Sequence, residues 1–267
     1  MLNSSATINP RTVLFLRIKR FLFKIRIYIF AVLLILLLVF LNNYGVFNIS
    51  KVHVKGIRSD NLTYISNDEI SGIKKNILGK SYFDITYESI SKQMSKIPYV
   101  QSFAIDKKFP YTVIIEIVER KPAYYITSGN NECALLDSSA YTLNAGSNKE
   151  ECETLYKSSK VDALTVTSTQ YQTFNAGEQS SYLFVLNFND IRKVFDEYSY
   201  GIEKIKVKDG VCEVFVNENQ SFVFSFNQEL KTQLARFVVV SDQIKSKNIE
   251  YSLVDLRYER PVIRGKE

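Results

Sequence analysis

The chain has 267 residues, of which 46% are apolar and 23% are charged, so it can bury a core and is not a disordered polymer. Its formal net charge of +6 is concentrated at the N-terminus, because the first 26 positions hold six basic residues and no acidic residue. The remaining 28 basic residues balance 28 acidic residues, which disfavours a phosphate-binding surface outside the N-terminus. We therefore expect no nucleic-acid partner.

The first predicted element is a membrane-spanning helix. The apolar run "IYIFAVLLILLLVFL", residues 27–41, is about 22 Å long as a helix, and flanking residues extend it toward the roughly 30 Å of a bilayer core. A cleaved signal peptide is the alternative, but the basic leader is long and "LNNYG" contains no small-x-small cleavage site. We predict a basic tail over 1–24 and a retained transmembrane helix over 25–46. The positive-inside rule predicts a cytoplasmic tail and an extracytoplasmic remainder.

The chain contains too few cysteines and histidines to suggest a catalytic site or a metal site. Cys133 and Cys152 lie in a polar, turn-rich region and could pair, whereas Cys212 in "VCEVFV" is expected to be a buried thiol. The single histidine, His53, alternates with valines and is expected on the solvent face of a strand close to the membrane, where it is poorly placed for a sortase-type Cys/His pair. We predict no catalytic residue, no metal ligand, no cofactor and no small-molecule substrate.

A strand and two helices are predicted next. "NISKVHVKGI" alternates apolar and polar residues imperfectly and ends at Gly56, as a half-buried strand does. In "SNDEISGIKKNILG", Ser66 and Glu69 have the spacing of a capping box, and a glycine ends the helix. A second helix is predicted over about 86–96, because its apolar residues recur at helical spacing before Pro98.

The segment "IPYVQSFAIDKKFPYTVIIEIVERKP" predicts two strands joined by a proline turn. Phe103 and Ile105 share one face of the first strand, and Val113, Ile115 and Ile117 share one face of the second. The order strand, helix, helix, strand, strand is typical of a small α+β domain with two helices on one face of a sheet.

These residues carry a resemblance to a known family. The order "FNISKVHVKG", "ISNDEI", "GKSYFDITYESISKQMSKIPYVQSFAIDKKFPYTVIIEIVERKPAYY" resembles the POTRA domain of the bacterial cell-division proteins of the FtsQ/DivIB family. The similarity rests on the elements "G-x-x-x-F", "I-P-Y-V", "F-P" and "E-R-K-P". We predict a POTRA-like domain over 47–122, in which Phe83 and Ile97 fill the core and Pro110 fixes a turn.

The second half predicts a β-rich domain over 123–264. Short strands are expected at "YYITS", "CALLD" and "VDALTV", and the polar stretch "NAGSNKEECETLYKSSK" is predicted to be an exposed loop. A helix over about 181–198, three strands over 201–226 with an Asp-Gly hairpin turn, and a helix over about 228–245 follow. The predicted fold is therefore α+β, with one transmembrane helix, a POTRA-like β-α-α-β-β domain and a β-rich domain with two helices.

The resemblance implies a role in division without catalysis. It implies a single-pass scaffold at the division septum that links early division components to the machinery of septal peptidoglycan synthesis. The implied partners are small bitopic coiled-coil proteins of the FtsB and FtsL kind, besides lipid around the anchor. One rival is a POTRA-bearing chaperone or translocation component, which would precede a barrel of amphipathic strands that this sequence lacks. A ligand sensor is a weaker rival, because residues 1–24 cannot form an output domain.

The closing segment "DLRYERPVIR" is the predicted partner site. Pro261 has no N–H to donate to a ladder, which favours a position at a sheet edge or at the first residue of a strand. Asp255 and Arg257 are expected to pair with each other. The alternative is an ordinary terminal strand covered by the chain's own helix. The resemblance, by order along the chain, assigns partner binding to Tyr258, Val262, Ile263 and Arg264.

Overall fold

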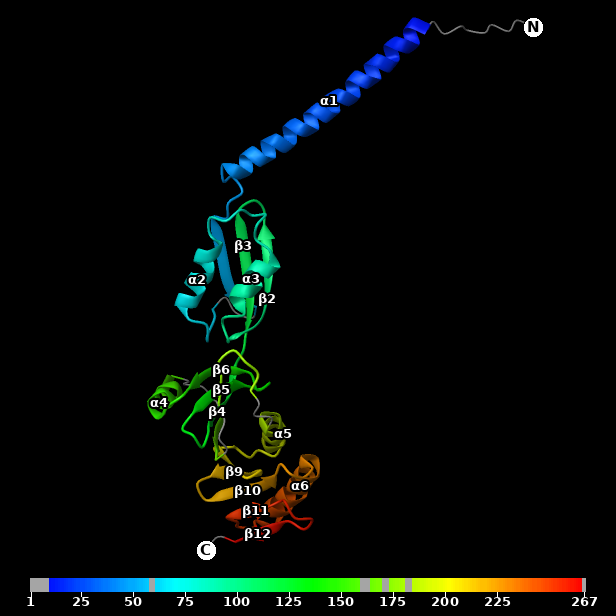
Figure 1. The fold of residues 1–267 in the computed structure, drawn as a ribbon. Coiled ribbons are helices and arrows are strands. Elements are labelled where there is room, and N and C mark those ends of the chain that lie inside the picture. The colour runs from blue at the N-terminus through cyan, green and yellow to red at the C-terminus, as the bar shows by residue number, and fades with distance from the viewer. Residues whose placement is uncertain (1–9, 58–60, 159–163, 170–172, 181–183, 266–267) are drawn as a thin grey trace, which may run out of the picture. The chain divides into compact units, whose positions relative to one another are not determined.

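The computed structural model describes residues 10–57, 61–158, 164–169, 173–180 and 184–265. An apolar helix is followed by a three-stranded sheet with two helices and then by a nine-stranded sheet with three helices (Figure 1). Parts of four predicted features lie outside the described residues, namely the start of the basic tail, the end of the polar stretch at 144–160, the start of the strand at "VDALTV" and the start of the helix at 181.

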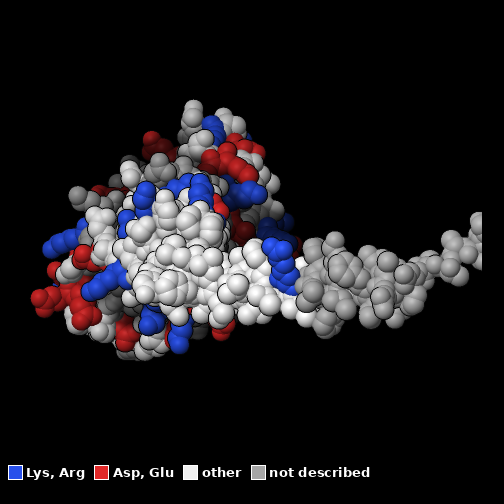
Figure 2. Space-filling model, turned by 90° about the horizontal axis from the view of Figure 1, so that it is seen from above, with Lys and Arg blue, Asp and Glu red and all other residues white. Residues whose placement is uncertain are grey.

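Helix α1 (Pro10–Asn43) contains residues 25–43 of the predicted membrane-spanning helix, which therefore ends three residues before the predicted limit at 46. Among the described residues it is the one helix long and apolar enough to cross a membrane, over Ile25–Asn43, and none of that segment is buried inside the protein. Nineteen helical residues extend about 28 Å, close to the thickness of a bilayer core. Figure 2 shows this part of the helix as an almost wholly uncharged surface.

The end of α1 is set by a glycine. Gly45 has a left-handed φ of 74°, its N–H donates to the carbonyl of Asn42 at 3.0 Å, and the next N–H, of Val46, reaches the carbonyl of Leu41 at 3.1 Å. This pair of bonds is the Schellman arrangement that closes a helix. A Cβ at Gly45 would lie 2.8 Å from the side chain of Asn48, so the turn favours glycine for space as well as for conformation.

The small sheet confirms the predicted β-α-α-β-β order. The element bounds are β1 (Lys51–Gly56), α2 (Asn67–Ile77), α3 (Tyr87–Met94), β2 (Val100–Lys108) and β3 (Thr112–Glu119). The strands lie in the order β1-β3-β2, so β3 is central. The capping box is present, since Ser66 donates through its backbone N–H and its hydroxyl to the carboxylate of Glu69 at 2.8 and 2.7 Å.

The core of the small domain is built on the predicted face of β3. Val113, Ile115 and Ile117 are buried on alternate positions, because successive side chains of a strand point to opposite faces. The prediction for Ile97 is confirmed, since it is buried, but the prediction that Phe83 fills the core is wrong, since 60% of its surface is exposed. Phe47 occupies the inner position instead, and the ring of Phe83 packs edge-on against it from outside at 5.6 Å.

The large sheet is mixed and contains nine strands. Its order is β12-β11-β10-β9-β8-β7-β4-β5-β6, with parallel pairs at β10/β11, β7/β8 and β4/β7. The Asp-Gly turn is confirmed, since Asp209 and Gly210 both have positive φ between β8 and β9, as a type I′ hairpin requires. The strands are β4 (Pro122–Thr127), β5 (Cys133–Asp137), β6 (Thr142–Gly146), β7 (Leu164–Ser168), β8 (Lys204–Lys208), β9 (Val211–Asn217), β10 (Gln220–Ser225), β11 (Leu253–Asp255) and β12 (Val262–Arg264).

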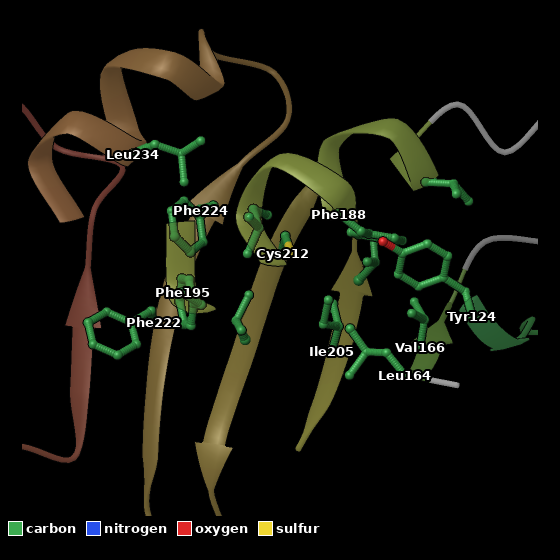
Figure 3. Packing of buried hydrophobic residues seen from close by; sticks show 14 of the residues in the cluster. Tyr124, Leu164, Val166, Phe188, Phe195, Ile205, Cys212, Phe222, Phe224 and Leu234 are labelled. Atoms are coloured by element: carbon green, nitrogen blue, oxygen red, sulfur yellow. The ribbon is translucent and has the colours of Figure 1, made fainter. Parts of the chain in front are cut away.

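Two of the predicted helices pack against the large sheet and form the main core together with it. Helices α5 (Phe184–Glu197) and α6 (Leu230–Lys247) place buried aromatic side chains against the sheet, and Figure 3 shows this layer between helix and strands. The rings of Phe195 and Phe237 stack at 4.3 Å, and Phe222 of β10 meets Phe237 edge-on at 4.9 Å. Burial of these large rings contributes strongly to the stability of this domain.

A third helix corrects the prediction of two helices and of an exposed loop. Helix α4 (Lys149–Ser158) forms within the polar stretch, where the side chain of Asn148 accepts the N–H of Glu151 at 2.9 Å and caps the helix start. Among the residues of this helix whose side chains are described, Cys152 and Leu155 are the buried ones, too few apolar residues for a helical pattern to be evident in the sequence.

Helix α4 covers the face of β5 that lies opposite to the main core. Ala134 and Leu136 belong to the main core, whereas Cys133 and Leu135 pack in a separate cluster with residues of α4, as the alternation of a strand requires. The sequence left open whether Cys133 pairs with Cys152, and the structure shows a disulfide between them that joins β5 to α4.

Candidate partner-binding edge

The predicted site lies at one end of the large sheet. β11 pairs in parallel with β10 and in antiparallel with β12, and β12 is the terminal strand of the sheet. No further strand pairs with β12 within the described part of the chain. A terminal strand presents unpaired backbone groups along its outer side.

The direction of each backbone group on β12 follows from the ladder. The carbonyl of Ser252 and the N–H of Leu256 bond to β10, so the alternate residues Leu253 and Asp255 turn their backbone groups toward β12. Their partners there are Arg264 and Val262. The residue between those two, Ile263, therefore turns its N–H and C=O away from β11.

The side chains of β12 divide between the two faces of the sheet. Ile263 lies opposite the buried Val254 and packs partly against the main core. Val262, with 46% of its surface exposed, and Arg264 face the other side. Tyr258 lies in the preceding loop and is 56% exposed. The structure thus brings three of the four predicted residues together on one short strand and places the fourth in the loop that leads to it.

An ion pair shapes the loop between β11 and β12. The two oxygens of Asp255 accept hydrogen bonds from the guanidinium of Arg257 at 2.9 and 2.6 Å, and the backbone N–H of Arg257 adds a third at 3.1 Å. Burial alone would raise the pKa of Asp255, but these hydrogen bonds and the charges of Arg257 and Arg264 hold that pKa below its ordinary value. The expected structural pairing of Asp255 with Arg257 is confirmed.

One residue that supports the site was not predicted. The guanidinium of Arg236, on α6, donates to the carbonyl of Leu256 at 3.1 Å and thereby ties the loop to the helix. Leu256 is fully buried beside it. Nothing in the sequence marks an arginine on the polar side of a helix as a contact of a distant loop.

The cysteines offer no reactive thiol in the described residues. Cys133 and Cys152 form a disulfide, and Cys212 is buried as predicted. Burial raises the pKa of the Cys212 thiol far above its ordinary value, so it stays protonated and unreactive. His53 is exposed on β1, as expected.

A comparison with known protein families identifies one domain of the chain. Residues 47–120, which include the whole three-stranded sheet and its two helices, match the family profile described as "POTRA domain, FtsQ-type". The protein therefore contains an FtsQ-type POTRA domain.

A second comparison finds a relative of the chain among characterised proteins. The chain is 33% identical over 88 residues to "Cell division protein DivIB" of Clostridium acetobutylicum, a match that covers 32% of this chain and 32% of the relative. The match thus spans about a third of that relative's length. Both comparisons support a relation to the FtsQ/DivIB family, and helix α1 is consistent with membrane anchoring. The predicted domain limits at 122 and 264 stay predictions.

Proposed function

We propose that the protein is a non-enzymatic scaffold of the division machinery at the septum. It links early division components to septal peptidoglycan synthesis by binding FtsB- and FtsL-like bitopic proteins. The FtsQ-type POTRA domain and the similarity to a DivIB protein support the division role. The exposed outer side of β12 supports a binding role for the β-rich domain.

The proposed orientation places the N-terminus in the cytoplasm and both folded domains outside. The basic residues that precede the apolar segment favour this orientation by the positive-inside rule. The Cys133–Cys152 disulfide supports it as well, because disulfides persist in oxidising extracytoplasmic compartments.

The partner is proposed to add a strand to β12. Ile263 offers one N–H and one C=O on the outer side, and an added strand would bond to both. The side chains of Val262 and Arg264 lie exposed on one face and would contact the partner's side chains, together with Tyr258 in the loop that precedes the strand. The observation that carries this proposal is that no strand in the described part of the chain pairs with the outer side of β12.

A proline substitution tests the backbone bond directly. Ile263→Pro removes the outward N–H without removing a bond to β11, so the sheet is expected to form, since proline is tolerated where a strand's N–H faces outward. We expect binding of the FtsB-like partner's extracytoplasmic segment to weaken about tenfold or more, equivalent to about 1.4 kcal/mol. Binding is measured by titration calorimetry on the full chain in detergent.

The matched control is Ile263→Ala, which also loses the side chain but keeps the N–H. It should bind much more tightly than the proline variant, and near-ultraviolet circular dichroism should show both variants folded. A folded proline variant with wild-type affinity would remove the strand-addition site. Septal fluorescence of a tagged chain in dividing cells tests the division role separately, and uniform membrane fluorescence at every stage would contradict it.

A further inference from the structure

An aromatic cluster lies exposed on the POTRA domain near the end of α1. We call it the aromatic cap, and it consists of Phe47, Tyr82, Phe83, Phe109 and Tyr111. Only Phe47 is buried, whereas Phe83 and Phe109 are 60% and 64% exposed. Both rings pack on Phe47, at 5.6 and 5.7 Å between centroids. Two phenylalanine rings thus remain largely in water beside a third that fills the domain's core.

The backbone beneath the aromatic cap is fixed. The N–H of Tyr82 donates to the carbonyl of Phe47 at 2.8 Å, and the N–H of Ser50 donates to the carbonyl of Tyr111 at 3.0 Å. The hydroxyl of Tyr82 donates to the carbonyl of Lys107 at 3.3 Å. Because three chain segments are joined in this way, the backbone that carries the exposed rings is held in place. A preorganised apolar surface of this kind is a mark of an interaction site.

Lysines accompany the rings. The ammonium of Lys107 lies 4.8 Å from the centre of the Tyr82 ring and donates to the Tyr82 carbonyl at 3.0 Å, and that of Lys51 lies 5.8 Å from the Tyr111 ring. Lys108, the last residue of β2, is exposed next to Phe109. The acidic residues Asp84 and Asp106 are adjacent in sequence to Phe83 and Lys107, so the surface is mixed in charge and mainly aromatic.

The aromatic cap is tethered close to the membrane anchor. Phe47 lies four residues after Asn43, the last residue of α1. Four fully extended residues span at most about 14 Å. The hydroxyl of Ser81, next to Tyr82, also donates to the side chain of Asn42 in the last turn of α1 at 2.9 Å. A lipid surface around the helix end is therefore always within reach of these rings, at a high effective concentration.

We propose that the aromatic cap binds the lipid surface of the membrane that α1 anchors. Phe83 and Phe109 enter the boundary between headgroups and acyl chains, where aromatic side chains are favoured. Lys107 and Lys108 keep their charges among the lipid phosphates while their stems cover apolar surface. The POTRA domain is then held against the bilayer by its own side chains as well as by the chain that connects it to α1.

The natural absence of tryptophan allows a direct test. Phe83→Trp is prepared in the full chain and reconstituted, without other proteins, into phosphatidylcholine and phosphatidylglycerol vesicles with lipids brominated near the carbonyl end of the acyl chains. Bromine quenches tryptophan only at short range, so proximity to the membrane without insertion gives little quenching. We expect blue-shifted emission and quenching several-fold stronger than in Tyr258→Trp, an exposed aromatic of the β-rich domain that serves as the matched control.

A second variant tests whether the rings act together. Adding Phe109→Ser to Phe83→Trp should reduce the quenching, while circular dichroism shows an unchanged fold. Equal quenching of Phe83→Trp and Tyr258→Trp would overturn the proposal. So would an emission shift of Phe83→Trp that occurs only after a division protein is added, because the aromatic cap would then be a protein-binding surface.

Discussion

The carboxylate of Asp255 is held by the guanidinium of Arg257, two residues later, through hydrogen bonds of 2.9 and 2.6 Å. This local ion pair turns the chain at the end of β11, and Arg236 fixes the next carbonyl from α6. Both contacts act on the loop that returns as β12. The terminal strand therefore depends on polar contacts outside its own three residues.

The first prediction concerns the pH dependence of the Asp255–Arg257 pair. Asp255 has a lowered pKa in the folded protein, so its contribution is present above the ordinary aspartate pKa and is lost as the pH falls through the folded value. Asp255→Asn should lower the free energy of unfolding at pH 7 by at most about 1 kcal/mol, because Arg257 is partly exposed and water screens its charge. Urea unfolding of the wild type and of Asp255→Asn is measured at pH 7 and at pH 3. The wild type should lose more stability than the variant when the pH is lowered from 7 to 3. An identical pH dependence in the two would contradict the role of the pair.

The second prediction concerns the Cys133–Cys152 disulfide. It closes a segment with a sequence separation of 19 residues, so its reduction should lower the free energy of unfolding by about 3 kcal/mol. Thermal unfolding with and without a reductant measures this loss. The double variant Cys133→Ser/Cys152→Ser should show the lower stability and no response to the reductant. If the reductant also lowered the stability of that variant, its effect on the wild type could not be assigned to the Cys133–Cys152 disulfide.

The third prediction tests the core of the POTRA domain. Ile115 is fully buried on β3, so Ile115→Asp should destabilise that domain by several kcal/mol, on the order of the cost of an unpaired buried charge. Lys108→Ala, at the exposed end of β2, should change the stability little. Circular dichroism during thermal unfolding compares the two. Equal melting temperatures would show that the assignment of the strand faces is wrong.

The fourth prediction concerns orientation in the membrane. A reporter fused after Glu267 should be active only outside the cytoplasm, and deletion of residues 17–26 should disturb insertion, because the charge difference across the apolar segment sets the orientation. Paired reporters, one active inside and one active outside, measure this. A cytoplasmic C-terminus would contradict the proposed scaffold role.

The sequence by itself determined the features that depend on neighbouring residues along the chain. The apolar run of α1, the Ser66–Glu69 capping box and the Asp209–Gly210 turn each draw on residues a few positions apart, so their patterns are visible without a fold. The alternation of β3 was equally clear, because one face of a central strand is wholly buried. These signals sufficed for the POTRA fold and for the likeness to FtsQ/DivIB proteins.

Only the tertiary structure decided what depends on partners distant in sequence. Among its described side chains, helix α4 buries Cys152 and Leu155 beside β5, so its apolar pattern is too weak for the helix to be predicted. Phe83 lies outside the core because Phe47, from a separate segment, already occupies the inner position. The outward direction of the Ile263 backbone is set by the register of β11 on β10 and of β12 on β11, and no local pattern of three residues specifies a register between strands.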